Sequence, residues 1–264
     1  AADNAAFGAY CLDVNTTGTQ NTAVGSGSLG SNTTASYNTA VGMNALTANT
    51  TGTYNSALGM SSLDANTEGT RNVGLGYGTL GANVLGSRST AIGTSALFVQ
   101  NPASAVDMYN TAVGFDAGAA VTTGVENTFM GGFAGDGTDD GGGNVAVGYA
   151  ALSANCDSNN VAIGNAAGLV ITGGSNTVMG AAAGYAVSSG DGNLLLGKDA
   201  GRTGSPGGNI TTADNIIVLG DENITAANIQ VDWTIASDAR DKTDIEDLSI
   251  GLDFVKQLKP KTYR

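Results

Sequence analysis

The chain has 264 residues, a net charge of −13, 41 glycines, 3 prolines and no histidine. Its low proline content excludes a Pro-rich disordered tract, and its glycines do not recur at every third residue, which excludes collagen. No apolar run approaches the roughly 18 residues of a membrane helix, and the acidic balance argues against nucleic-acid binding, so we expect neither membrane insertion nor a nucleic-acid partner.

A repeat of about 17 residues extends from the start of the chain to about residue 201. Each unit ends in Asn-x-x-x-Gly in eleven of the twelve units, and in the remaining unit Ser89 takes the place of the asparagine. The first residues, AADNAAFG, already belong to a unit, so we expect the natural chain to begin earlier. So regular a period predicts an all-β fold, a parallel β-solenoid of about twelve coils. The closing glycines are Gly8, Gly25, Gly42, Gly59, Gly76, Gly93, Gly114, Gly131, Gly148, Gly164, Gly180 and Gly197.

Both faces of the strand that precedes each closing glycine are apolar. The residue directly before the glycine is always apolar, and the one before that is usually alanine, as in Ala40 and Val41. Adjacent strand residues point to opposite faces, and a strand with two apolar faces is covered on both sides. One cover is the interior of the coil. We infer that the other is a neighbouring chain, and we expect a homotrimer.

The length of the unit suits two short strands and two turns, and twelve coils stacked at about 4.8 Å give a rod of roughly 60 Å. The fourth residue after the closing glycine is leucine through Leu97 and mostly glycine afterwards. The insertion FVQNPASAVDMY at residues 98–109 separates the two types, so we expect the coil cross-section to change there. The repeated asparagine predicts an internal ladder of stacked amides rather than a row of ligands.

Several short motifs in the repeat resemble binding sites. GSGSLG (25–30) and GYGTLG (76–81) fit a dinucleotide fingerprint, but both follow the repeat and lack a βαβ context, so we expect no cofactor. Asp136, Asp139 and Asp140 could bind calcium, although a solvated turn is the simpler interpretation of this incomplete ligand pattern. Cys11 and Cys156 lie eight coils apart, which is too far for a disulfide.

Five N-x-[ST] sequons occur, and three of them recur at the repeat spacing, which indicates turn positions rather than glycosylation sites. They begin at Asn15, Asn32, Asn49, Asn209 and Asn223.

The sequence changes character after residue 201. Residues 202–215 break the period and are expected to form a linker, while residues 216–220 and 227–235 have the composition of strands. Residues 1–236 hold 17 acidic and 4 basic side chains, whereas residues 237–264 hold six of each. We therefore expect a repeat shaft (1–201), a neck with short strands (202–236) and a separate C-terminal unit (237–264).

Leu252, Val255 and Leu258 recur at helical spacing in the C-terminal unit, and Pro260 follows them, so we expect a short helix.

The Asn-Thr-Ala-Val-Gly-x-x-Ala motif resembles the head repeats of trimeric autotransporter adhesins and similar repeats of phage tail fibres. That resemblance covers about residues 1–201 and implies a trimeric β-roll.

The C-terminal unit resembles the beginning of the intramolecular chaperone domain that follows endosialidase tailspikes and other phage fibres. The resemblance implies a domain that assembles the trimer and then cuts itself off, with Ser237 as the nucleophile, Lys242 as its base and cleavage between Ala236 and Ser237. A lysine can activate a serine hydroxyl when it is desolvated. Read from spacing alone, Ser237 would cap a turn and Lys242 would pair with Asp238. The family domain continues beyond residue 264, so we expect a longer natural chain. The matching residues are Ser237, Asp238, Arg240, Lys242, Ile245, Gly251, Leu252, Pro260 and Tyr263.

Together these features predict a structural fibre, a phage tail fibre of the virion that binds other tail proteins and a host cell-surface receptor, for which a glycan is a candidate, with no catalysis beyond self-cleavage. A bacterial surface adhesin is the alternative. A tailspike depolymerase would need a pair of carboxylates in a cleft, which regular turns do not predict.

Overall fold

The computed structural model describes residues 2–230, which consist of short β-strands joined by turns. These described residues contain no helix, and hence none that could cross a membrane. The strands are β1 (Ala5–Phe7), β2 (Thr22–Val24), β3 (Thr39–Val41), β4 (Ser56–Leu58), β5 (Val73–Leu75), β6 (Thr90–Ile92), β7 (Thr111–Val113), β8 (Thr128–Met130), β9 (Val145–Val147), β10 (Val161–Ile163), β11 (Thr177–Met179), β12 (Leu194–Leu196) and β13 (Ile217–Leu219).

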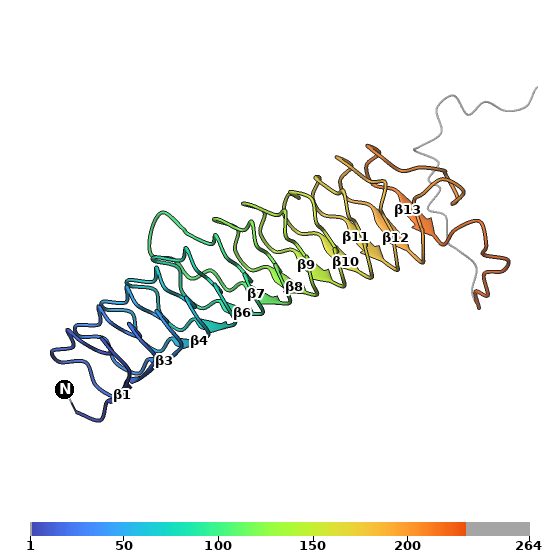
Figure 1. The fold of residues 1–264 in the computed structure, drawn as a ribbon. Coiled ribbons are helices and arrows are strands. Elements are labelled where there is room, and N and C mark those ends of the chain that lie inside the picture. Colours follow the sequence, from blue (N-terminus) through green and yellow to red (C-terminus); the bar gives the residue numbers. More distant parts are fainter. Residues whose placement is uncertain (1, 231–264) are drawn as a thin grey trace, which may run out of the picture. The chain divides into compact units, whose positions relative to one another are not determined.

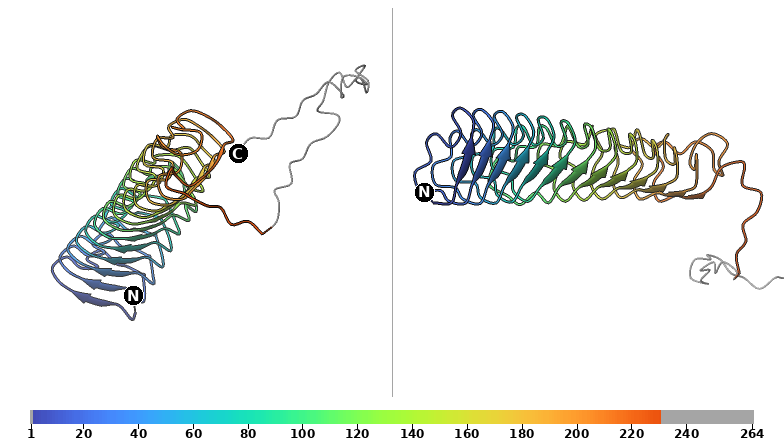
Figure 2. Two further views of the ribbon diagram at one scale, coloured as in Figure 1. Left: turned by 90° about the vertical axis from the view of Figure 1, so that its right-hand side faces the viewer. Right: turned by 60° about the horizontal axis from the view of Figure 1, so that its bottom comes forward.

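All thirteen strands form one parallel sheet in the order of the sequence. Each strand pairs with the equivalent strand of the next coil, so that Val41 lies beside Leu58 and Leu58 beside Leu75. Figure 1 shows the resulting stack, and Figure 2 shows the strands in a single row along it. The predicted parallel β-solenoid is confirmed. The chain divides into two units, Ala1–Thr225, which holds this sheet, and Ala226–Arg264.

Each coil contains one strand rather than the predicted two. The rest of the coil is a stack of turns because recurring positions have a positive φ, which an extended strand does not allow. The fourth residue after the closing glycine is one of them, with φ of 52° at Leu46 and 54° at Leu63. The turns still join neighbouring coils, since the backbone N–H of Leu46 donates to the carbonyl of Ser62 at 3.0 Å.

The closing glycines stack in one column because no side chain fits there. Gly42 has a φ of 137°, and a Cβ on it would lie 2.5 Å from the carbonyl oxygen of Gly59 in the next coil. Equivalent close approaches recur along the stack. The repeat therefore requires glycine for both its backbone conformation and its spacing.

The interior of the solenoid is a narrow column of small and aliphatic side chains. The middle residue of every strand from β2 to β13 is buried, as are the leucines that follow in each turn, such as Leu46 and Leu63. Where glycine replaces this leucine, another side chain fills the space. A Cβ on Gly135 would lie 2.5 Å from the ring of Phe129, and one on Gly168 would lie 2.8 Å from Ile171. The expected change in the coil interior is thus a redistribution of core volume.

The repeated asparagines form the predicted ladder. Asn38 is buried, its Oδ1 accepts a hydrogen bond from the backbone N–H of Asn55 at 2.9 Å, and its Nδ2 donates to the carbonyl of Gly52 at 2.9 Å. A second ladder links asparagines at the sequons, with Asn49 Nδ2 donating to Asn32 Oδ1 at 3.1 Å. Asn32 and Asn49 are fully buried, which confirms that these sequons are turn positions.

The insertion at residues 98–109 supplies hydrogen-bonding partners where Ser89 takes the place of asparagine in the first ladder. Ser89 Oγ donates to Oε1 of Gln100 at 3.1 Å, and Nδ2 of Asn110 donates to the same oxygen at 2.9 Å. Met108 from the insertion is fully buried. The insertion is visible as a wider loop, drawn in green, in Figure 1.

The solenoid continues beyond the period. Strand β13 confirms the strand expected within residues 216–220, and it pairs with β12 in the same parallel register. Leu196 lies beside Leu219, so residues 202–215 belong to a longer coil of the solenoid. Of the other expected strand, residues 227–230 have no strand structure, and the remainder lies outside the described residues.

Candidate functional site

The outward face of the sheet is the first candidate site, because it leaves large apolar side chains uncovered. Among the middle residues of the strands, Ala40 and Ala57 point into the coil with 0% and 1% exposed. The following residues point outward, and Leu58 is 50% and Met130 46% exposed. The large apolar column therefore lies outside the coil and the small column inside. A continuous apolar row of this kind is typical of an interaction surface.

A second column of exposed side chains lies just before the strands. Each coil contributes one side chain to the column, and the side chains of successive coils lie next to one another. The rings of Tyr37 and Tyr54 stack with centroids 4.8 Å apart, and the guanidinium of Arg71 lies 5.4 Å from the centroid of Tyr54. Arg88 lies 5.7 Å from the ring of Tyr109 and forms an ion pair with Asp107 at 2.8 Å. These contacts join neighbouring coils at the surface, and each stacked cation contributes about 0.5–1 kcal/mol at such exposed positions.

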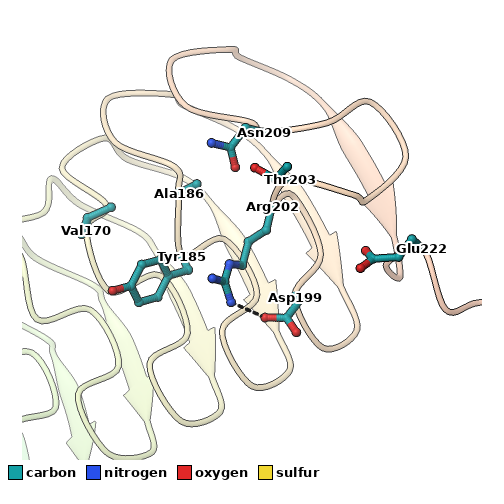
Figure 3. A pocket seen from close by; sticks show the side chains of 8 residues that line it. All are labelled: Val170, Tyr185, Ala186, Asp199, Arg202, Thr203, Asn209 and Glu222. Atoms are coloured by element: carbon teal, nitrogen blue, oxygen red, sulfur yellow. Dashed lines mark hydrogen bonds and ion pairs between the residues drawn. The ribbon is translucent and has the colours of Figure 1, made fainter.

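The longer coil that ends in β13 forms a pocket of about 530 Å³ (Figure 3). Apolar and aromatic side chains from the two preceding coils meet polar side chains from residues 199–209 and from the segment after β13. Its lining consists of Val170, Tyr185, Ala186, Asp199, Arg202, Thr203, Asn209 and Glu222.

Ionic contacts fix the centre of this pocket. Arg202 Nη1 and Lys198 Nζ each lie 2.5 Å from an oxygen of Asp199. The hydrogen bond from Lys198, with a further one from Arg202, holds the pKa of Asp199 below its ordinary value. The guanidinium of Arg202 also lies over the ring of Tyr185, 5.0 Å from its centroid. Asp199 is thus a carboxylate at neutral pH, and Arg202 is held between two partners (Figure 3).

Sequence reasoning did not find this pocket. Its signal was present, because Arg202 is one of only four basic residues in residues 1–236 and it opens the segment that breaks the period. That segment was expected to be a linker.

The aspartates that could have bound calcium do not form a metal site. Within residues 2–230, no group of three or more His, Cys, Asp or Glu side chains is arranged to hold a metal ion. Asp139 instead accepts a hydrogen bond from Thr122, and Asp136 is partly buried. Cys11 and Cys156 are free thiols, as expected from their separation.

Ser237 and Lys242, the predicted nucleophile and base, lie outside the described residues, and so do the predicted helix and the Ala236–Ser237 junction.

Residues 237–264 match the family model of the chaperone of endosialidase, which supports the chaperone resemblance seen in the sequence. No curated protein and no solved structure matches the chain. The chain thus combines a parallel β-solenoid with a C-terminal segment similar to the chaperone of endosialidase.

Proposed function

We propose that the chain is the shaft of a trimeric phage tail fibre that takes part in host attachment. In this proposal the C-terminal chaperone assembles three chains and is then released by cleavage between Ala236 and Ser237. The mature trimer belongs to the virion and connects other tail proteins to a receptor on the host surface. The observation that carries the proposal is the combination in one chain of a solenoid with an uncovered apolar column and a chaperone-like segment directly after it.

The uncovered apolar face of the sheet supports the proposed trimer. A single solenoid leaves large apolar strand residues, such as Leu58 and Met130, about half exposed to water. Burying the exposed half of one such side chain contributes about 1 kcal/mol. Each coil repeats the same position, so the gain accumulates along the rod when three chains place these faces against a common axis.

The resemblance of residues 237–264 to the chaperone of endosialidase supports the proposed release of the chaperone. Lys242 would accept the proton of the Ser237 hydroxyl, and the serine oxygen would attack the carbonyl carbon of Ala236. The C–N bond between Ala236 and Ser237 would then break as Lys242 returns the proton to the Ser237 amine, and water would hydrolyse the resulting ester to release the carboxylate of Ala236. This requires a lysine that is neutral at the moment of attack, which a folded and desolvated site can provide and a free peptide cannot. Cleavage therefore depends on the folded chaperone.

The test uses the full-length protein, including the complete chaperone domain. Wild type, Ser237→Ala and the control Ser31→Ala, an exposed serine of the shaft, are expressed and measured by denaturing and native mass spectrometry. We expect wild type and the control to yield a trimeric shaft ending at Ala236, and Ser237→Ala to yield an uncut trimer. Monomeric shafts would disprove the fibre assembly, and an intact wild type or a cut Ser237→Ala would disprove the cleavage.

A further inference from the structure

We propose that each copy of the chain packs the side chains that precede its strands against the side chains that follow the strands of the next copy. The proposal rests on the trimer proposed above and assigns the residues through which neighbouring copies meet. The entry column consists of the fifth residue before each closing glycine, such as Tyr54, and the exit column of the residue directly after that glycine, such as Met60. Both lie two residues beyond an end of a strand, here β4, so they flank the outward face of the sheet.

The two columns match each other coil by coil. Four coils between β3 and β7 carry a large side chain in both columns, and the coils of β10 and β11 carry small or polar side chains in both. In the coils of β8 and β9 a glycine occupies one of the two columns. Both columns thus change from large to small side chains over the same part of the solenoid. The large pairs are Tyr37 with Met43, Tyr54 with Met60, Arg71 with Tyr77, and Tyr109 with Phe115, and the small or polar pairs are Asn159 with Asn165 and Ser175 with Ala181.

This match does not arise from contact within one chain. Tyr54 and Met60 are six residues apart along a strand and its flanks, which corresponds to about 20 Å at about 3.3 Å per residue. Among the described residues, the ring of Tyr54 contacts Tyr37 and Arg71 of its own column. The aromatic and methionine members of the four large pairs are 42–52% exposed. Two separate exposed columns that vary together indicate a surface at which two molecules meet.

A second copy of the chain is the partner that presents the matching column. The partner must offer one side chain per coil, at the spacing of the strands and in the same order of large and small residues. Rotational symmetry about an axis along the solenoid places equivalent coils of each copy at the same height. Contact between two different columns is heterologous and closes into a ring, whereas an isologous contact would place Tyr54 against Tyr54 of the other copy.

The chemistry of the large pairs favours this contact. A methionine thioether packs well against an aromatic ring, as Met60 would against Tyr54 of the next copy. Arg71 forms no ion pair within residues 2–230, and its guanidinium lies over Tyr54 of its own chain. Tyr77 of the next copy would provide a second ring for the same cation. The contact also extends the apolar column of the sheet, because Met43 lies two residues after Val41.

The experiment is cysteine cross-linking in the full-length protein with its complete chaperone domain. Tyr54→Cys and Met60→Cys are combined in one chain and treated with a bis-maleimide whose two-carbon spacer is too short to join the two columns of that chain. We expect most of the protein to migrate as a covalent trimer in denaturing gel electrophoresis. Tyr37→Cys with Met43→Cys, one coil away, should give the same product.

Three controls separate this contact from other arrangements. Wild type accounts for cross-linking through the native thiols Cys11 and Cys156. Each single variant, Tyr54→Cys or Met60→Cys, should give no cross-link, because a heterologous contact does not bring a residue to its own copy. Tyr54→Cys with Ala181→Cys uses the same two columns seven coils apart, about 34 Å along the solenoid, and should also give none.

The proposal is overturned if folded trimers of both double variants give no covalent trimer, if a single variant gives covalent dimers, or if the Ala181→Cys control cross-links equally well. Circular dichroism establishes that each variant is folded. Native mass spectrometry before cross-linking separates the pairing from the trimer on which it rests. A trimer that does not cross-link contradicts the pairing of the columns alone, whereas a monomeric wild type contradicts the trimer and the pairing together.

Discussion

The side-chain amide of Gln100 donates a hydrogen bond to Oδ1 of Asn83 at 3.1 Å, and its oxygen accepts from both Ser89 and Asn110. One glutamine thereby terminates the second amide ladder and bridges the gap in the first. All four side chains are at most 1% exposed, so none can exchange these contacts for water. The insertion is tolerated because it brings this residue into the core.

Gln100→Ala is therefore expected to destabilise the solenoid strongly. The substitution leaves buried amide and hydroxyl groups without partners, and each such group costs about 1–3 kcal/mol. We expect a loss of about 3 kcal/mol or more in the free energy of unfolding, measured by urea titration. Gln20→Ala changes an exposed glutamine and is the control. A loss equal to that of the control would show that the bridge has no energetic role.

The contact between Gly135 and Phe129 makes a second prediction. Gly135→Leu introduces a side chain that most other coils carry at this position, but its Cβ would lie 2.5 Å from the Phe129 ring. We expect a loss of about 1–3 kcal/mol from overpacking. Adding Phe129→Ala to this variant restores the alanine and leucine pair found in most earlier coils. The double variant should recover much of the lost stability. If the losses in melting temperature from the two single substitutions simply add in the double variant, Phe129 does not fill the space that leucine occupies in other coils.

The proposed trimer is tested by substitutions at adjacent residues. Val41→Asp places a charge on the outward face of the sheet, so we expect monomers in which the β-sheet signal in circular dichroism remains. Ala40→Asp places the charge inside the coil and should unfold it locally, since Ala40 is 0% exposed. Thr51→Asp lies on an exposed turn and should change neither property. A Val41→Asp protein that remains trimeric in light scattering would exclude this face as the interface.

Stability should also depend on Asp136. Burial raises the pKa of its carboxyl above the ordinary value of 3.8, and Oδ1 is buried without a hydrogen-bond partner among the described residues. The folded chain thus holds this proton more tightly than the unfolded chain. Stability from this group is complete below pH 3.8 and declines as the pH rises through the folded pKa.

Asp136→Asn remains neutral at all pH values and should remove this decline. We expect a higher melting temperature than wild type at pH 7 and a smaller difference at pH 3.5. Asp140→Asn, at an exposed neighbour, is the control. An equal difference at both pH values would mean that ionisation of Asp136 does not matter.

The sequence predicted the fold where one residue type has one physical reason to recur. Gly42 is required by close backbone contact, and Asn38 by buried backbone groups in the turn, so both columns could be recognised without a structure. The prediction of a second strand in each coil was wrong because Leu46 has a positive φ. A leucine in the sequence does not indicate that conformation.

The candidate sites were harder to predict. The two apolar columns indicated that both faces of the strand are covered. The sequence could not tell that Val41 faces outward and Ala40 inward. The pocket depends on how Arg202 and Asn209 fold back over earlier coils, and that loop has no periodicity from which its course could be inferred.

In the described sheet each strand pairs only with the strands that precede and follow it, and the register never shifts. The coils are therefore equivalent structural units, and their number sets the length of the solenoid. Excising residues 43–59 would join Gly42 to Met60, which occupies the place of Met43, and would shorten the rod by about 4.8 Å without creating a new kind of contact. Length can thus be adjusted by recombination between repeats, independently of whatever is attached to either end.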